Sequence, residues 1–330
     1  MSFDQILGAG VAHLMAGARR VVRVSAGVRQ GEHVIIITDV ERPPDVAAAL
    51  SAAVIEVGGL PLIVTMPPLR SGDEPMPPAV AALAAADVIL APTSGAIYHT
   101  AAIRDAALAG ARFVGLTGFS PDVLLSGGVF ADFPSLAGDA YRLTDLLTQA
   151  NTARVTSPGG TDLTVSLLGR AAIPITGMVR ERGERTACPD VEAFIAPLET
   201  SANGVIVVDA SASIAGVLEE PIRLTIKEGR AVEITGGEGV DSIRAALEAA
   251  GTPNAYILAE LAFGLNPDGI IRGVIVEDEG VAGTGHVALG SNSFFGGTSV
   301  APIHLDFVYH SPTLWLDGQI VIKDGEFLSR

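Results

Sequence analysis

The chain has 330 residues, of which 48% are hydrophobic and 18% are charged, and its net charge is −16. This length exceeds one comfortable core and predicts two domains. The negative charge excludes a surface built to bind nucleic acid phosphates and disfavours anionic membranes, and no run of roughly 18 apolar residues is long enough to span a bilayer.

The first 150 residues alternate short apolar runs with Ala-rich amphipathic stretches. Buried strands that alternate with helices are typical of a doubly wound parallel sheet. We therefore predict an α/β domain over residues 1–150. The expected strands cover residues 32–39, 60–65, 86–92 and 111–118, and the expected helices cover residues 43–59 and 98–110.

A different pattern begins between residues 145 and 155. Segments of alternating polarity are broken by Gly and Asp turns, and "KEGRA" and "LDGQ" have the composition of hairpin turns. One helix is expected over residues 239–251, with Asp241 as its N-cap and Gly251 at its end. We predict a mainly antiparallel α+β domain over residues 151–330.

Cys188 is the one cysteine of the sequence. An internal disulfide is thus impossible, and a reducing cytoplasm is the expected compartment. The first 24 residues, "MSFDQILGAGVAHLMAGARRVVRV", include an early acidic residue and no unbroken apolar run, which is not the pattern of a secretory signal peptide. A soluble cytoplasmic protein is therefore expected.

Histidines are concentrated near the end of the chain. The sequence has only six, and three of them lie in "GTGHVALGSNSFFGGTSVAPIHLDFVYH", residues 283–310. In a strand, the spacing of His304 and Asp306 directs both side chains to one face. An imidazole beside a carboxylate is half of a site for a divalent transition metal. Taken alone, the pattern also fits a partly buried histidine beside a surface acid.

Three further polar residues interrupt apolar surroundings. His286 lies in "GTGHVALG" and Glu260 in "ILAELAFGLNP", where an ionised Glu is costly unless it is paired or binds a cation. Glu192 in "CPDVEAFIAPLE" has apolar neighbours too and gives the weakest signal. Coincidence of these features favours a metal centre over satisfied core polar groups. The candidate ligands are Glu192, Glu260, His286, His304 and Asp306.

The motifs "CPDVEAFIAP", "AELAFGLNP", "GTGHVALG" and "IHLDF…LWLDG" resemble, in order and spacing, those of the aminopeptidase T-type metallopeptidase family. The resemblance covers essentially the whole chain at low similarity, and the C-terminal motifs are its specific part. It implies metal-ligand roles for the same five residues, an N-terminal α/β domain, a C-terminal metal-bearing domain and dimerisation.

The chain also resembles the 2,5-dihydroxypyridine 5,6-dioxygenases, which are relatives of that family and cleave an aromatic ring with non-haem iron. That resemblance implies a metal triad at Glu260, His304 and Asp306, although the dioxygenases have His where this chain has Glu260. His99 in "IYHTAAIRDA" matches a catalytic histidine of the dioxygenases. The overall length is also closer to theirs.

The two chemistries ask for different ligand sets. An iron oxygenase needs three ligands on one face and open positions for O₂ and substrate. Five ligands, three of them anionic, would crowd a single iron, whereas two metals about 3.5–4 Å apart need several carboxylates. The residue set therefore predicts hydrolysis first and dioxygenation second.

The resulting hypothesis is a metal-dependent hydrolase that cleaves a C–N bond of a peptide or small amide with a metal-bound hydroxide. One or two Zn, Mn or Co ions are expected, and His99 would protonate the leaving group. The alternatives are an Fe(II) ring-cleaving dioxygenase acting on a hydroxylated pyridine-like compound and a non-catalytic small-molecule binding module. Expected partners are a small-molecule or short peptide substrate and further copies of the chain, as a homodimer or higher homo-oligomer.

Overall fold

The computed structural model describes residues 10–328 and divides into two compact units. Met1–Phe133 and Thr176–Pro189 form the first unit, and Pro134–Ile175 and Asp190–Arg330 form the second. Residues 1–9 of the N-terminal segment, whose pattern differs from a signal peptide, lie outside the described residues. Within residues 10–328, no helix has both the length and the apolar character needed to cross a membrane.

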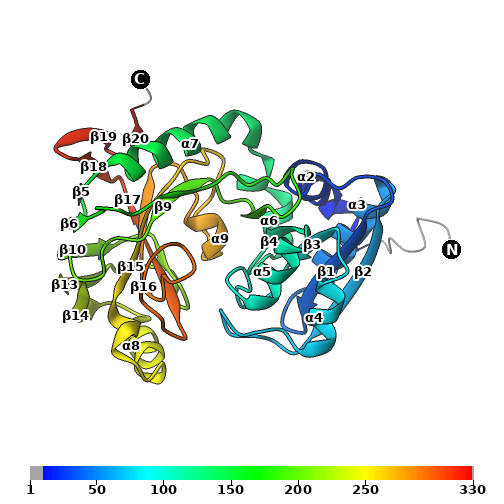
Figure 1. Ribbon diagram of the computed structural model, residues 1–330, viewed down its shortest axis with the longest axis horizontal. Coiled ribbons are helices and arrows are strands. Elements are labelled where there is room, and N and C mark those ends of the chain that lie inside the picture. Colours follow the sequence, from blue (N-terminus) through cyan, green and yellow to red (C-terminus); the bar gives the residue numbers. More distant parts are fainter. Residues whose placement is uncertain (1–9, 329–330) are drawn as a thin grey trace. The chain divides into compact units, whose positions relative to one another are not determined.

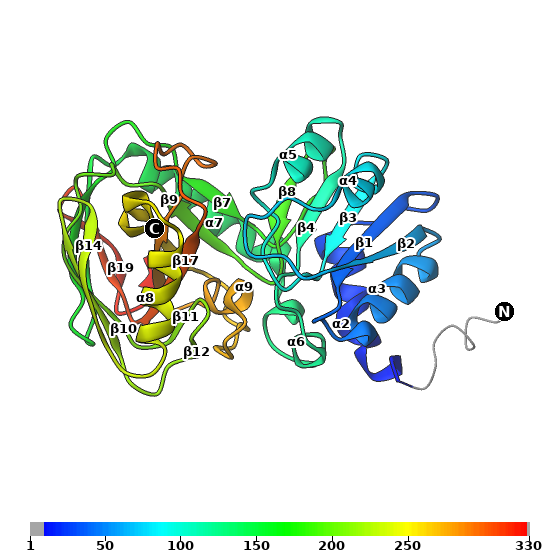
Figure 2. The same ribbon diagram turned by 90° about the horizontal axis from the view of Figure 1, so that it is seen from below.

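The first unit is built on a five-stranded parallel sheet (Figures 1 and 2). Its strand order is β2-β1-β3-β4-β8, and every neighbouring pair is parallel. The strands are β1 (His33–Asp39), β2 (Leu60–Met66), β3 (Val88–Ala91), β4 (Arg112–Gly115) and β8 (Arg185–Ala187). The helical segments are η1 (Ala12–Leu14), α2 (Met15–Arg20), the π-helical turn η2 (Val21–Ser25), α3 (Pro44–Glu56), α4 (Pro77–Leu83), α5 (Ala101–Leu108), α6 (Pro121–Leu125) and η3 (Gly128–Phe130).

Helices cover both faces of this sheet, which explains its continuous apolar runs. Ile35 and Ile37 of β1 pack with residues of α4 and α5, such as Leu83 and Ile103. Figure 2 shows α2 and α3 on the other side of the strands. Because β1 is buried on both faces, it does not alternate in polarity. The α/β architecture expected from the first half of the sequence is thus confirmed.

The second unit contains two antiparallel sheets. The eight-stranded sheet has the order β14-β13-β10-β6-β5-β18-β19-β20, and the seven-stranded sheet has the order β12-β11-β17-β16-β15-β9-β7. The first sheet comprises β5 (Thr152–Thr156), β6 (Asp162–Ser166), β10 (Asn203–Val208), β13 (Ile222–Lys227), β14 (Arg230–Gly236), β18 (Thr313–Leu316), β19 (Gln319–Lys323) and β20 (Glu326–Phe327). The second comprises β7 (Ile173–Ile175), β9 (Glu192–Ile195), β11 (Ser211–Ala212), β12 (Gly216–Val217), β15 (Leu258–Gly264), β16 (Thr284–Gly290) and β17 (His304–His310).

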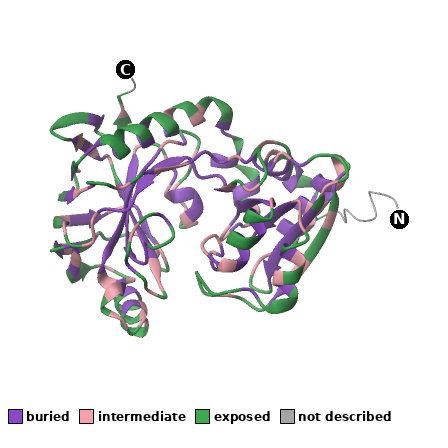
Figure 3. Cartoon of the chain, in the orientation of Figure 1, coloured by how far each residue is buried: buried purple, intermediate pink, exposed green. Residues whose placement is uncertain are grey.

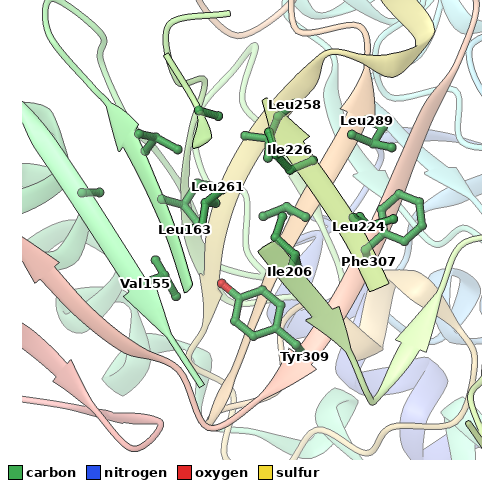
Figure 4. Packing of buried hydrophobic residues seen from close by; sticks show 14 of the residues in the cluster. Val155, Leu163, Ile206, Leu224, Ile226, Leu258, Leu261, Leu289, Phe307 and Tyr309 are labelled. Carbon is green, nitrogen blue, oxygen red and sulfur yellow. The ribbon is translucent and has the colours of Figure 1, made fainter. Parts of the chain in front are cut away.

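A hydrophobic core lies between these two sheets (Figure 4). Leu163, Ile206 and Leu224 come from the eight-stranded sheet, and Leu261 and Phe307 come from the seven-stranded sheet. Strands β15 and β16 of the seven-stranded sheet are buried along their whole length, whereas helices α7 and α8 are exposed over much of their surface (Figure 3). The helices are α7 (Phe133–Gln149), α8 (Val240–Ala249), η4 (Pro253–Tyr256) and α9 (Ile275–Asp278).

Two details differ from the sequence-based expectations. The prediction of Asp241 as N-cap is wrong, because α8 begins after Gly239, whose left-handed φ of 92° suits glycine, and Asp241 lies inside the first turn. The chain also passes between the units three times rather than once near residue 150. Helix α7 belongs mostly to the second unit, and the segment Thr176–Pro189 returns to the first to add β8.

Candidate metal centre

Strand pairing brings the five predicted ligands to one face of the seven-stranded sheet. Residues directly opposite one another in antiparallel strands point to the same face. Ala288 of β16 is opposite both Glu260 of β15 and Asp306 of β17. The remaining three follow from the same register, since Ala262 is opposite His286, Gly264 is opposite Glu192, and Gly290 is opposite His304.

Small residues between the ligands leave room on this face. Ala262, Ala288 and Gly290 occupy the positions across from ligand residues. The intervening residues, among them Val287, Leu305 and Phe307, point to the opposite face and belong to the hydrophobic core. The alternation of the strands therefore places a polar cluster directly behind a packed apolar layer.

Two groups of three side chains lie close enough to hold a cation each. Candidate ligand atoms of Glu192, Glu260 and His286 lie within 4.8 Å of one another, and so do those of Glu260, His304 and Asp306. His286 Nδ1 is 3.6 Å from Glu192 Oε2, and His286 Nε2 is 3.6 Å from Glu260 Oε1. His304 Nε2 is 3.1 Å from Glu260 Oε2 and 3.2 Å from Asp306 Oδ1. Glu260 thus belongs to both groups, one carboxylate oxygen facing each histidine.

Two acids near the cluster were not among the predicted ligands. Glu279, just after α9, forms a third group with His286 and Asp306. Asp190 is 1% exposed and precedes Glu192 by two residues. The i, i+2 spacing to Glu192 was a signal for Asp190, since it repeats the His304–Asp306 pattern. Glu279 gave no such signal because "VEDEG" has the composition of a solvated acidic turn.

Negative charge accumulates at this buried place. Burial raises the pKa values of Asp190, Glu192 and Glu279 well above their ordinary range, and nearby carboxylates raise them further. Within residues 10–328, no Arg or Lys forms an ion pair with any acid of the cluster. The negative charge of these acids is therefore balanced only by the two histidines and by bound protons. A divalent cation would supply the missing positive charge.

For Glu260 and His304, interactions with neighbouring charged groups shift the pKa in the direction opposite to the effect of burial. Burial alone would raise the pKa of Glu260, but His286 and His304 outweigh it and lower this pKa to about 2. Burial would lower the pKa of His304, but Asp306 and Glu260 outweigh it and hold this pKa well above its ordinary value. Glu260 is therefore the ionised centre of the cluster.

The donor set fits a transition metal. Glu192 Oε2, His286 Nδ1 and Asp190 Oδ1 are buried atoms without a hydrogen-bond partner. Buried polar atoms are normally paired, so an unpaired imidazole nitrogen 3.6 Å from an unpaired carboxylate oxygen calls for a further partner. Nitrogen and oxygen donors of this kind suit Zn, Mn and Co. Which ions bind, and through which of these residues, stays a prediction.

His99 lies in the first unit, just before α5, where its ring packs against Tyr98 with 4.9 Å between centroids. The five predicted ligands belong to the second unit. A shared catalytic role of His99 and the metal cluster therefore stays a prediction.

Comparison with known proteins places the chain in a family. The model of the 2,5-dihydroxypyridine 5,6-dioxygenase family, NicX, matches residues 14–329. The chain belongs to this family. No curated protein sequence matches it.

Two solved structures share the fold over nearly the whole chain. 2,5-dihydroxypyridine dioxygenase from Pseudomonas putida KT2440 is 22% identical, with a TM-score of 0.80, and the match covers 96% of this chain and 97% of that one. Wild-type AmpT from Thermus thermophilus is 17% identical, with a TM-score of 0.69 and coverage of 96% and 99%. Both resemblances expected from the motifs are confirmed. At these identities the likeness establishes a common fold.

Proposed function

We propose that this member of the NicX family is a two-metal hydrolase that cleaves a C–N bond in a peptide or small-molecule amide. The supporting observation is the sharing of Glu260 between two groups of candidate ligands. A carboxylate with one oxygen toward each group is the arrangement that a bridging ligand between two cations requires. A single cation would use only one of these groups.

Each protein group then has a defined task. Glu192 and His286 would hold one ion, His304 and Asp306 would hold the other, and Glu260 would join them. When bound, such a pair of divalent ions acidifies water and neutralises negative charge that develops on a carbonyl oxygen. The buried carboxylates would hold such ions in a place with little water, where their electrostatic effect on a substrate would be strengthened.

Ring-cleaving dioxygenation is the second candidate, and family membership favours it. Non-haem Fe(II) oxygenases commonly use two histidines and one carboxylate on one face of the iron. The corresponding group here, Glu260, His304 and Asp306, has one histidine and two carboxylates. The additional donors Glu192 and His286 give a second place for a cation, which a mononuclear iron enzyme does not need. For these reasons hydrolysis is the preferred function.

Metal stoichiometry and two activity assays separate the candidates. The protein is stripped with a chelator and reloaded without oxygen with Zn, Mn, Co or Fe(II), and bound metal is measured by elemental analysis. Each form is assayed against amino-acid p-nitroanilides and dipeptides, and for O₂ uptake with 2,5-dihydroxypyridine. Two ions per chain and amide cleavage by the Zn, Mn or Co forms are expected.

The result that contradicts the proposal is equally definite. One iron per chain, together with O₂ uptake and no cleavage of any amide, assigns the chain to the dioxygenases. Saturable ligand binding without turnover in every metal form assigns it to the binding modules.

His99 as proton donor to the leaving group is a separate part of the proposal. Loss of a general acid lowers kcat by a factor of about 10² to 10⁴. His99→Gln is therefore expected to lower kcat in this range at unchanged metal content. An unchanged kcat removes His99 from the catalytic group. Association of copies and the choice of a small-molecule or short peptide substrate remain predictions.

A further inference from the structure

The loop formed by residues 291–303, between β16 and β17, contacts the ring of His304. His304 Nδ1 lies 2.8 Å from the main-chain oxygen of Ser291. A carbonyl oxygen only accepts hydrogen bonds, so this contact requires the proton on Nδ1. His304 Nε2 is thereby directed to Glu260 and Asp306, at 3.1 and 3.2 Å. Such a bond to the second ring nitrogen commonly fixes the tautomer of a metal-binding histidine.

Glu199 holds this loop from outside. Its Oε1 accepts hydrogen bonds from the main-chain N–H of Thr298, at 2.6 Å, and from Asn292 Nδ2, at 3.2 Å. Its Oε2 forms an ion pair with Arg170 at 2.5 Å. Arg170 in turn donates to the main-chain oxygen of Gly296. Three points of the loop are therefore tied to one ion pair on neighbouring segments of the second unit.

Asn292 transmits this restraint to the start of the loop. Its side chain is fully buried, and its Oδ1 accepts a hydrogen bond of 2.8 Å from the N–H of Ser299. Gly297 lies so close that a Cβ at this position would be 2.0 Å from the Asn292 carboxamide. Asn292 directly follows Ser291, so fixing its side chain fixes the carbonyl that receives His304 Nδ1.

The loop also contacts the histidine ring itself. Phe295 is 5% exposed, and its ring packs edge-to-face on His304 with 5.9 Å between centroids. Phe295 packs in the same way on Phe194 of β9, at 5.3 Å. Displacement of the loop would therefore remove both the hydrogen bond to His304 and the aromatic wall beside it.

We propose that Glu199 is a positioning residue for the metal centre. It secures the 291–303 loop so that the Ser291 carbonyl keeps His304 in the tautomer protonated at Nδ1, with Nε2 presented to the cation. Glu199 supplies no atom to the three candidate ligand groups, and it acts through Arg170, Asn292 and Ser291. The inference rests on the metal centre of the proposed function and is independent of the reaction performed there.

Glu199→Gln tests this role with a matched control. Gln keeps the shape of the side chain but removes the charge that pairs with Arg170. Glu32→Gln is the control, because Glu32 forms an ion pair with Arg112 in the first unit at the same distance of 2.5 Å. The side chains of Glu32 and Arg112 are 19% and 3% exposed, and those of Glu199 and Arg170 are 15% and 10% exposed. Any general effect of breaking a largely buried ion pair appears in both variants.

Two measurements are made on the full chain. The Zn(II) dissociation constant is measured by competition with a chromophoric chelator, and the ¹⁵N chemical shifts of the His304 ring are measured in the metal-free protein at a pH above the raised pKa of His304, where the imidazole is neutral. Loss of an outer partner of a metal ligand costs about 10- to 100-fold in metal affinity. Glu199→Gln is expected to weaken Zn(II) binding at least tenfold and to mix the two tautomers of His304. Glu32→Gln is expected to leave both unchanged.

A Zn(II) dissociation constant within twofold of wild type, with unchanged His304 shifts, overturns the proposal. Equal weakening by both variants also overturns it, because the effect is then one of general stability. Should Glu199→Gln fail to fold, Arg170→Lys replaces it and is expected to change both readouts in the same direction, by a smaller factor. If the wild-type protein binds Zn(II) but cleaves no amide, the proposed function is wrong and this inference still holds. If the wild-type protein does not bind Zn(II), this inference is wrong.

Discussion

The two faces of the seven-stranded sheet are made by the same strands and differ in their physical character. On one face, side chains such as Leu261, Val287 and Phe307 are fully buried in an apolar core. On the other, Glu260 and Asp306 belong to a cluster of acids and histidines. Because neighbouring residues of a strand point to opposite sides, stability and chemistry are separated by a single position along the chain. Substitutions one residue apart should therefore have different kinds of effect.

Truncation on the apolar face should have the largest effect on folding. Phe307→Ala removes a fully buried ring from between the sheets and is expected to lower the free energy of unfolding by about 3–5 kcal/mol. Urea unfolding of the metal-free protein measures this change. A loss below about 1 kcal/mol would mean that the face is not a packed core.

Truncation one residue away should act on the cation instead. Asp306→Ala is expected to weaken metal binding at least 100-fold, about 2.7 kcal/mol, because a direct ligand contributes no less than its outer partners. Metal content after gel filtration measures the loss, and His304→Ala should give the same result. Asp162→Asn, an exposed acid of the other sheet, is the control. Unchanged metal retention in both ligand variants would refute the assignment.

The pH dependence of the metal-free protein sharpens the contrast. Asp190, Glu192 and His304 have raised pKa values in the folded state. Raised folded-state pKa values mean stability that is present at low pH and lost as pH rises toward those values. Each group is expected to cost about 1.4 kcal/mol per pH unit above its ordinary pKa while it remains protonated in the fold.

Thermal unfolding of chelator-treated protein between pH 5 and pH 8 measures this decline. Glu260, with its pKa of about 2, changes stability only in more acidic solution and leaves this window unaffected. Metal-loaded protein should show a weaker decline, since a cation takes the place of the protons. Constant or rising stability of the metal-free protein would contradict the burial of an acidic cluster.

A charge-removing substitution should give the smallest and least usual effect. Glu192→Gln is expected to stabilise the metal-free protein by about 1 kcal/mol at pH 6 and by more at pH 8, because an acid buried beside other acids becomes less favourable as pH rises. The gain should vanish at pH 5, where Glu192 is already protonated. Zn(II) affinity should fall in the same variant. Destabilisation at pH 8 would show that Glu192 contributes to packing more than to ligation.

Local sequence patterns were sufficient for the parallel strands and for much of the site. Strand β1 is buried on both faces and forms an unbroken apolar run, so it was found within one residue at each end. Strand β2 was found equally closely from its apolar sequence, although Leu60, Leu62 and Ile63 of this strand are exposed. Glu260 and His286 were found because an ionisable residue inside an apolar run is costly to bury unless it is paired or binds a cation.

Non-local features were beyond the sequence. Strand β8 has three residues, Arg185–Ala187, without an apolar run, and it pairs with a strand about seventy positions earlier. Glu279 lies in an acidic turn and reaches the cluster only through the path of the chain after α9. The role of Glu199 depends on hydrogen bonds to a loop nearly one hundred residues away, and no spacing rule reveals such a contact.

The presence of both His304 and Asp306 on β17 has a consequence for folding fidelity. A slip of this strand by one residue would turn both polar groups into the hydrocarbon layer and would push Leu305 and Phe307 toward the acids. Such a mispaired state would be less stable for two reasons: charged groups would be desolvated on the apolar face of the sheet, and apolar packing would be lost. The candidate metal ligands His304 and Asp306 thus also favour pairing of the central strands in the correct register.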